Sequence, residues 1–411
     1  MQRDERHGRV IRLLSVVASS LAVVLFVSAC SVGGTSTGKP ESDKPIKIGF
    51  TADLSGVQRS IGRSIKNGFQ IYLDRNGGKL GGRKVTLVVE DESDNPKDAA
   101  KAIKALMEED DLLAIAGISD VRTAVAMYPE LQKKKIPALV SLACTDQLPD
   151  VTYMWCIPHL TSYHAASLGG YVAGKVKGPV YVLGTDLGPG KAVTTQGFVD
   201  TFKAAGGRVS NQGGKAAYAP YSEKTSYKQY LDEAVASGAE AIYVWATGLQ
   251  AVQFVKEYSK HEAASKLTVY AGGPLTCCDL LALEGKAALG IYSALDYTAD
   301  LDNDANRKFV VAYQEKYDRV PNEPAAFGYS GAVVLDKAIT AVIKSGEELN
   351  GVAVERALEH IGIIEDPRGR WAFDDKHVAV SRFYLRQVQM DGSVLTNVLI
   401  TELSSPGLHV E

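Results

Sequence analysis

The stretch from Pro45 to Gly78 reads PIKIGFTADLSGVQRSIGRSIKNGFQIYLDRNGG. The run IKIGFTA that follows the proline is mostly apolar, which is typical of a buried strand. After a short polar loop, apolar residues recur at three- and four-residue spacing, which predicts a helix with one apolar face. The two glycines at its end are a helix C-terminal signal, because glycine readily adopts the left-handed backbone found there. The stretch therefore predicts a strand, a loop and a helix that packs back on the strand.

Strand-like and helical segments alternate in the same way through most of the chain. The further strand-like runs are KVTLVVED, LLAIAGIS, IPALVSLA, PVYVLGTD, EAIYVWAT, LTVYAGG and GIYSALDY. Strands that alternate with helices predict parallel sheets covered by helices on both faces. The end of the chain differs, because GRWAFDD, SRFYLRQVQMDGS and VLTNVLITEL predict antiparallel strands with a turn at MDGS.

The first 30 residues predict export. Four arginines precede an apolar run from residue 13 to residue 27, and small residues follow it, as in a signal peptide. The run is shorter than the about 20 residues of a membrane-spanning helix, although an uncleaved anchor is the alternative. The tetrapeptide that ends at Cys30 resembles the lipobox of bacterial lipoproteins, which implies cleavage before Cys30 and a lipid on its sulfur. We interpret residues 1–29 as a lipoprotein signal peptide and residues 30–45, rich in Gly, Ser, Thr and Pro, as a flexible tether.

Charge and motifs exclude several classes of function. The formal charge of the chain is −3, and removal of residues 1–29, which carry a net +2, leaves −5. A mildly acidic chain without a basic block argues against nucleic acid as a partner. The seven histidines are scattered without metal-ligand spacing, so we predict no metal site and no cofactor, and we interpret His159 and His164 as structural. No nucleophile stands beside a base in a catalytic motif, so we expect no enzyme.

The quoted stretch and the one after it, LGGRKVTLVVEDESDNPKDAAKAIKALM, resemble the opening of the type 1 periplasmic-binding-protein family. The match is to the receptors for branched-chain amino acids and related solutes of ABC importers, and the order of blocks continues as far as GRWAFDD. The resemblance implies an α/β fold of two doubly wound lobes with parallel sheets, joined by a three-stranded hinge. It also implies a small-molecule solute in the cleft between the lobes and delivery to an ABC transporter permease. The anchor would hold the protein on the outer face of the cytoplasmic membrane. A ligand-binding sensor subunit of a signalling system is the alternative.

Chain length agrees with two lobes. About 365 residues follow the tether, which is too many for one compact core. We expect the first lobe to hold residues 46–158 and 298–384, and the second lobe to hold residues 159–297 and 385–403.

The candidate ligand-binding residues follow the ends of the predicted strands, because ligands of open α/β sheets bind beyond the carboxyl ends of the strands. In the first lobe they are Ser55, Val57, Ile61, Asp120, Arg122, Thr123, Ala143, Cys144 and Thr145. In the second lobe they are Leu187, Gly188, Trp245, Thr247, Leu275, Thr276 and Cys277. The resemblance singles out Thr145, because the family grips its ligand at this position through backbone groups and a hydroxyl.

Several of these residues have a structural interpretation as well. Asp120 follows a strand and precedes a predicted helix, so it either caps that helix or contacts the ligand. Thr123 or the amides that open the helix could bind a carboxylate. Arg122 could pair with a ligand carboxylate or could face solvent. Trp245 could form an aromatic wall or could pack beneath the cleft.

The second lobe departs from the pattern of the amino-acid receptors. Those receptors carry a carboxylate after a Gly-Pro pair, where this chain has Leu275, and an aromatic residue where this chain has Leu187. A buried ammonium without a negative partner costs several kcal/mol. We therefore expect a small, partly apolar solute such as an organic acid or amide. A branched-chain amino acid stays open if one of three other carboxylates replaces the missing one, namely Asp120, Asp186 or Asp296.

Four cysteines remain once Cys30 carries a lipid. An even number outside the cytoplasm favours two disulfides, and four cysteines allow three pairings. A bond between the two implied lobes would oppose hinge motion, so the pairing that spares the hinge joins Cys144 to Cys156 and Cys277 to its neighbour Cys278. Free thiols and bonds between the lobes are the alternatives.

Overall fold

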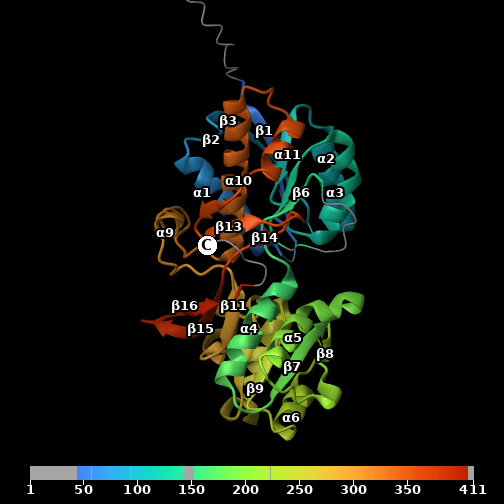
Figure 1. Ribbon diagram of the computed structural model, residues 1–411, viewed down its shortest axis with the longest axis vertical. Coiled ribbons are helices and arrows are strands. Elements are labelled where there is room, and N and C mark those ends of the chain that lie inside the picture. The colour runs from blue at the N-terminus through green and yellow to red at the C-terminus, as the bar shows by residue number, and fades with distance from the viewer. Residues whose placement is uncertain are drawn as a thin grey trace, which may run out of the picture. The chain divides into compact units, whose positions relative to one another are not determined.

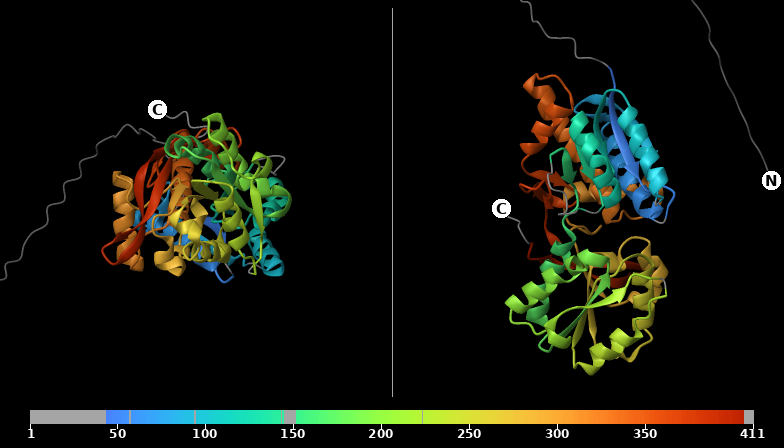
Figure 2. Two further views of the ribbon diagram at one scale, coloured as in Figure 1. Left: turned by 90° about the horizontal axis from the view of Figure 1, so that it is seen from below. Right: turned by 90° about the vertical axis from the view of Figure 1, so that its right-hand side faces the viewer.

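The computed structural model describes residues 44–56, 58–93, 95–142, 144, 152–222 and 224–405. Within this part of the chain, strands and helices build two main sheets and one small sheet (Figure 1). The predicted α/β fold with two doubly wound lobes is confirmed. Helices lie on both faces of each main sheet, as the alternation of segments requires (Figure 2).

The first sheet has the order β2-β3-β1-β4-β5-β6 and is parallel except for the short edge strand β2. Its strands are β1 Ile46–Ala52, β2 Lys79–Leu80, β3 Arg83–Asp91, β4 Leu112–Ala116, β5 Ala138–Val140 and β6 Met154–Cys156. The helices that follow these strands are α1 Arg59–Arg75, α2 Pro96–Glu108 and α3 Val121–Lys134. Strands β1 and β4 are buried along nearly their whole length, which explains why their sequences are apolar rather than alternating.

A later part of the chain returns to this sheet. It comprises α9 Asp304–Tyr317, α10 Glu323–Ser345, α11 Gly351–Glu359, β12 Ile364–Asp366, β13 Gly369–Phe373 and β14 Ala379–Val380. The last three strands form the small antiparallel sheet. Helix α10 packs along α1 at glycine contacts, since a Cβ atom on Gly68 would lie 1.8 Å from the carbonyl oxygen of Ala325. By length and composition α10 could cross a membrane, but 67% of its most apolar window is buried, as in a core helix.

The second sheet has the order β16-β15-β11-β10-β9-β7-β8. Its parallel strands are β7 Val180–Asp186, β8 Ala217–Pro220, β9 Ala241–Val244, β10 Thr268–Gly272 and β11 Tyr292–Leu295. The antiparallel pair β15 Phe383–Asp391 and β16 Val394–Leu403 completes the edge, with the predicted turn between them. The helices around this sheet are α4 Thr161–Lys175, α5 Gln196–Ala204, α6 Lys228–Ala236, α7 Gly248–Tyr258 and α8 Leu280–Glu284.

Three segments connect the elements of the first sheet with those of the second. They are residues 157–160 between β6 and α4, residues 296–303 between β11 and α9, and residues 381–382 between β14 and β15. We propose the lobe boundaries at these connections. Below, the first lobe means the first sheet, the small sheet and helices α1–α3 and α9–α11, and the second lobe means the remaining elements.

Candidate functional site

The loop after β1 is fixed by Asp53. The carboxylate of Asp53 accepts hydrogen bonds from the backbone N–H groups of Gly56 at 2.5 Å and Gln58 at 2.8 Å. Ser55 lies exposed at the tip of this loop, whereas Ile61 is half-buried against the core of the first lobe. The loop is therefore rigidly held while the side chain of Ser55 is accessible.

Glu92 is linked to this loop through Ser119 and was not among the predicted site residues. One of its oxygens accepts hydrogen bonds from the backbone N–H of Ser119 at 2.8 Å and from the Ser119 hydroxyl. That hydroxyl in turn accepts the N–H of Asp53 at 2.9 Å, so the ends of β1, β3 and β4 are joined by one network. The other oxygen of Glu92 has no hydrogen-bond partner within the described residues. Burial raises the pKa of Glu92 to about 7, although the hydrogen bonds from Ser119 lower it in part.

Asp120 caps helix α3. Its carboxylate accepts the backbone N–H of Arg122 at 2.7 Å and pairs with the Nε of the same arginine at 3.0 Å. Burial alone would raise the pKa of Asp120, but these bonds outweigh burial and lower it. Asp120 thus caps the helix as its structural interpretation predicts, its contact with a ligand stays a prediction, and Arg122 is an exposed side chain held by this pair. Thr123 is buried in the first turn of the helix.

Four predicted residues lie outside the described residues: Cys30, Val57, Ala143 and Thr145. Their roles in lipidation and ligand binding stay predictions. Cys144 lies next to this region, is buried in the first lobe and is bonded to Cys156 at the end of β6.

In the second lobe, Leu187 and Gly188 follow β7 and are exposed, and Leu187 keeps 42% of its surface accessible. Asp186, at the end of the same strand, accepts the N–H of Gly188 at 3.0 Å and pairs with Lys191 at 3.1 Å. These contacts lower the pKa of the Asp186 carboxyl. The negative charge of Asp186 is therefore paired within the loop after β7.

Trp245 is 7% exposed and packs against the end of β10, where a Cβ atom on Gly272 would lie 2.6 Å from the indole ring. This placement agrees with the interpretation of Trp245 as a residue beneath the strand ends. Its ring N–H has no hydrogen-bond partner within the described part of the chain. Thr247, which precedes α7, is half-buried and makes no capping bond with its side chain.

Leu275 and Thr276 lie fully buried in the loop after β10. Leu275 belongs to the apolar core of the second lobe. The hydroxyl of Thr276 lies 3.1 Å from both the Ser293 hydroxyl and the side-chain oxygen of Asn397. Neither side chain is accessible in this structure, so their contact with a solute stays a prediction.

The vicinal cysteines follow immediately. Cys277 and Cys278 form a disulfide, and Cys278 takes a left-handed backbone with φ of 63°. The structure thus contains the two bridges of the pairing that spares the hinge. The loop also touches the first lobe, because Asp279 contacts the Ser60 hydroxyl on α1 and the Cys277 sulfur lies 3.8 Å from a carboxyl oxygen of Glu323 on α10. The vicinal pair therefore lies in a loop that meets both lobes.

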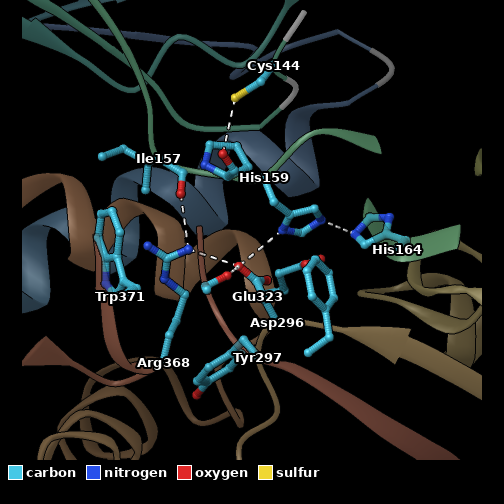
Figure 3. Close-up of polar contacts among 12 residues, drawn as sticks. Cys144, Ile157, His159, His164, Asp296, Tyr297, Glu323, Arg368 and Trp371 are labelled. Carbon is cyan, nitrogen blue, oxygen red and sulfur yellow. Dashed lines mark hydrogen bonds and ion pairs between the residues drawn. The ribbon is translucent and has the colours of Figure 1, made fainter. Parts of the chain in front are cut away.

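Four buried polar side chains, here termed the hinge cluster, meet at Asp296: they are Asp296 itself, His159 and Arg368, which Figure 3 shows, and Ser381. One oxygen of Asp296 lies 2.9 Å from an Nη of Arg368, 3.0 Å from the Ser381 hydroxyl and 3.2 Å from the Nδ1 of His159. Burial would raise the pKa of Asp296, but His159 and Arg368 bring it well below its ordinary range. His159, Asp296 and Ser381 come from the first, second and third connections respectively. Asp296 therefore holds all three connections together.

Arg368 fixes the cluster to the first lobe. A second bond from its guanidinium reaches the carbonyl oxygen of Ile157 at 3.0 Å, and its guanidinium lies 4.2 Å from the ring centre of Trp371. Glu323, the first residue of α10, lies beside the cluster, and burial together with the Asp296 carboxylate raises its pKa well above the ordinary value.

The comparisons with other proteins agree with this architecture. The family of periplasmic binding proteins matches residues 45–393. The chain belongs to this family. No curated protein matches it. Among solved structures, this periplasmic binding protein is similar to an ABC transporter substrate-binding protein from Sphaerobacter thermophilus, with 26% identity, a TM-score of 0.79 and coverage of 87% of this chain and 98% of the other.

Two further structures share its fold. One is a solute binding protein of an ABC transporter from Rhodopseudomonas palustris BisB5 in complex with 3,4-dihydroxybenzoic acid, with 24% identity, a TM-score of 0.75 and coverage of 88% and 99%. The other is the branched-chain amino acid transporter substrate binding protein from Streptococcus pneumoniae in complex with isoleucine, with 18% identity, a TM-score of 0.72 and coverage of 88% and 100%.

Sequence reasoning missed three features of this binding protein: the buried Glu92, the contact of Ser60 with Asp279, and the hinge cluster. A carboxylate directly after a strand was a visible signal for Glu92. The other two join residues that are far apart in the chain, so no local pattern could have indicated them.

Proposed function

We propose that the protein is the solute receptor of an ABC importer and that it binds a small carboxylic acid with an aromatic or apolar body. It acts by binding, without catalysis. Membership of the periplasmic binding protein family and the similarity to transporter receptors support the role of receptor. The solved relatives that bind 3,4-dihydroxybenzoic acid, benzoate and p-hydroxybenzoic acid support the class of solute.

The observation that carries the choice of solute is that three carboxylates are already paired. Asp120, Asp186 and Asp296 were the candidates to receive the ammonium of an amino acid in place of the missing family carboxylate. In the structure they pair with Arg122, Lys191 and Arg368 respectively. An amino acid would have to compete with one of these existing partners or bury its ammonium without a partner, and an unpaired buried ammonium costs several kcal/mol. A carboxylic acid without an ammonium avoids this cost.

The contacts proposed for the acid lie at the strand ends of both lobes. The Thr145 hydroxyl with neighbouring backbone groups would hold the carboxylate, while Leu187 would line the ring and Trp245 would support the site from beneath the strand ends. Ser55, exposed on the loop after β1, would contact the rim of the solute.

The location of the receptor is also a proposal. A signal peptide that ends before Cys30 and a lipid on this cysteine would hold the protein on the outer face of the cytoplasmic membrane. There the tether of residues 30–45 would let the receptor reach its permease. The lipobox-like tetrapeptide that ends at Cys30 supports this location.

The experiment is a thermal-shift screen of the purified protein followed by calorimetry. The compounds are benzoate, 4-hydroxybenzoate, 3,4-dihydroxybenzoate, leucine and isoleucine, with benzamide and benzyl alcohol as neutral analogues. A ligand at 100 times its Kd stabilises the folded state by about 2.7 kcal/mol, so binders are readily detected. We expect the benzoates to give the largest shifts and benzyl alcohol to give none. Larger shifts with leucine or isoleucine would overturn the choice of solute, and no binding by either class would argue against this receptor role.

A further inference from the structure

Two histidines and a glutamate converge in the buried region beside the hinge cluster. His159 lies in the first connection, His164 in the first turn of α4, and Glu323 at the start of α10. The Nε2 atoms of the two imidazoles face each other, with ring centres 4.0 Å apart (Figure 3). One ligand atom from each of the three residues lies within 4.8 Å of the other two. All three side chains are at most 9% exposed.

From this geometry we infer that His159, His164 and Glu323 form a binding site for a transition-metal ion of the zinc type. Two imidazole nitrogens and one carboxylate oxygen are a donor set that Zn²⁺ uses, with a fourth position left for water or another ligand. Donor atoms around tetrahedral zinc lie about 3.3 to 3.6 Å apart, which follows from bond lengths of 2.0 to 2.2 Å.

The surroundings of His159 match those of a metal ligand. Histidines that bind metals donate their other ring N–H to a carboxylate or carbonyl group, which fixes the ring and its tautomer. The Nδ1 of His159 lies 3.2 Å from Asp296, and Asp296 is itself held by Arg368 and Ser381. With its proton on Nδ1, His159 presents the lone pair of Nε2 toward His164 and Glu323.

A hydrogen bond between the two imidazoles is the simpler explanation of their contact. It satisfies the two Nε2 atoms but does not involve Glu323, whose carboxyl group has the neighbouring carboxyl group of Asp296 as its counterpart and whose Oε1 has no other partner in the described part of the chain. A buried carboxyl oxygen without a partner is costly. A metal ion would bind both Nε2 atoms and a carboxyl oxygen of Glu323 at once, whereas the Nδ1 of His164 has no partner among the described residues.

A metal ion at this site would connect the two lobes, because its three ligands come from different parts of the fold. Glu323 begins a helix of the first lobe, whereas His164 belongs to a helix of the second lobe and His159 to the segment between them. The ion would therefore tie the two lobes together at the hinge. Sequence spacing predicted no metal site, because Glu323 is far from the two histidines along the chain.

The test uses untagged protein that has been treated with a chelator and dialysed. Zn²⁺ is titrated by calorimetry, bound metal is counted by elemental analysis, and Co²⁺ serves as a spectroscopic probe. We expect one ion per chain, an increased melting temperature with Zn²⁺, and the intense visible bands of tetrahedral Co²⁺. Mg²⁺ should not bind, because it prefers oxygen ligands.

The variants His164→Gln and Glu323→Gln should bind Zn²⁺ at least about tenfold more weakly. The matched control is His360→Gln, because His360 is an exposed histidine that contacts only the backbone oxygen of Arg356 among the described contacts. This control should bind Zn²⁺ as the unchanged protein does. Absence of a stoichiometric ion in the unchanged protein, or equal affinity in His164→Gln, would overturn the inference. If a variant does not fold, the Co²⁺ spectrum and the stoichiometry of the unchanged protein still decide the question.

Discussion

Asp296 and Asp120 both follow strands of the parallel sheets, yet they find their partners at very different distances along the chain. Asp296 is bound by Arg368, 72 residues away, and by Ser381, 85 residues away. Asp120 is bound by Arg122, only two residues away, and Asp186 by Lys191, five residues away. The pairs at the strand ends are local, whereas the hinge cluster exists only when both lobes and all three connections are in place.

This difference has consequences for stability. A local pair on an exposed loop contributes little, because solvent screens it and the chain needs no folding to bring its members together. A buried pair between distant segments is costly to break, because the remaining charge stays in a medium of low polarity. Changes at the hinge should therefore affect folding, while changes at the strand ends should affect it much less.

The largest effect is expected for Arg368→Met. The substitution leaves the Asp296 carboxylate buried without its guanidinium, which should reduce the free energy of unfolding by about 3 to 5 kcal/mol. The matched control is Arg370→Met, two residues away, because Arg370 pairs with Glu365 on the surface. This substitution should reduce the free energy of unfolding by less than about 1 kcal/mol. Urea unfolding followed by circular dichroism measures both. Equal losses in the two variants would contradict the contrast between hinge and surface.

Loss of the two disulfides should lower the free energy of unfolding by different amounts. Replacing Cys144 and Cys156 by Ser opens a loop with a sequence separation of 12 residues and should cost about 3 kcal/mol. Replacing Cys277 and Cys278 by Ser opens a bridge between neighbours, which restricts the unfolded chain very little, so the cost should be below about 1 kcal/mol. Thermal unfolding of the two double variants without reductant compares them. A larger loss from the vicinal pair would show that its loop stabilises the contact between the lobes more than we expect.

Glu92, at the strand ends of the first lobe, should make the stability of the protein depend on pH. Its pKa in the folded protein is about 7, against an ordinary value of 4.5, so the folded state holds a proton that the unfolded state has lost between these values. The contribution to stability is complete below about pH 4.5 and is lost as the pH rises through about 7. In Glu92→Gln, the free energy of unfolding should fall less between about pH 5 and pH 8 than in the unchanged protein. The control is Glu90→Gln on β3, which should leave the pH dependence of the unfolding free energy unchanged. The same pH dependence in Glu92→Gln as in the unchanged protein would contradict the raised pKa of Glu92.

The smallest effect is expected at the helix cap. Asp120→Ala removes the side chain that accepts the N–H of Arg122 and should cost about 1 kcal/mol. Asp120→Asn keeps an acceptor of equal capping strength and should cost almost nothing. Chemical unfolding of both variants provides the measurement. A large loss in Asp120→Asn would mean that the charge of Asp120, rather than the cap, matters for the fold.

The same contrast explains what the sequence could and could not predict. The alternation of strands and helices, the turn between β15 and β16 and the capping position of Asp120 all depend on neighbouring residues, and all are found in the structure. The two cysteine pairs were predicted from the requirement that no disulfide block the motion of the hinge. The hinge itself was inferred from the family resemblance.

The remaining features depend on tertiary packing. Two partners of Asp296, His159 and Ser381, lie in the other two connections, and Arg368 lies between β12 and β13, so only the completed fold brings them together. The burial of Leu275 and Thr276 arises from packing against the core and against Asn397 on β16, far along the chain. Strand order and the partners of a buried side chain produce no periodic pattern in the sequence. The sequence could therefore suggest Leu275 and Thr276 as site residues but could not predict which way their side chains point.

The most direct test of the account is solution X-ray scattering of the same preparation alone, with saturating 4-hydroxybenzoate and with isoleucine at the same concentration. Two lobes that turn about the hinge cluster and close on a small acid predict a smaller radius of gyration with 4-hydroxybenzoate and an unchanged one with isoleucine. An unchanged radius with bound 4-hydroxybenzoate, or compaction by isoleucine, would contradict it.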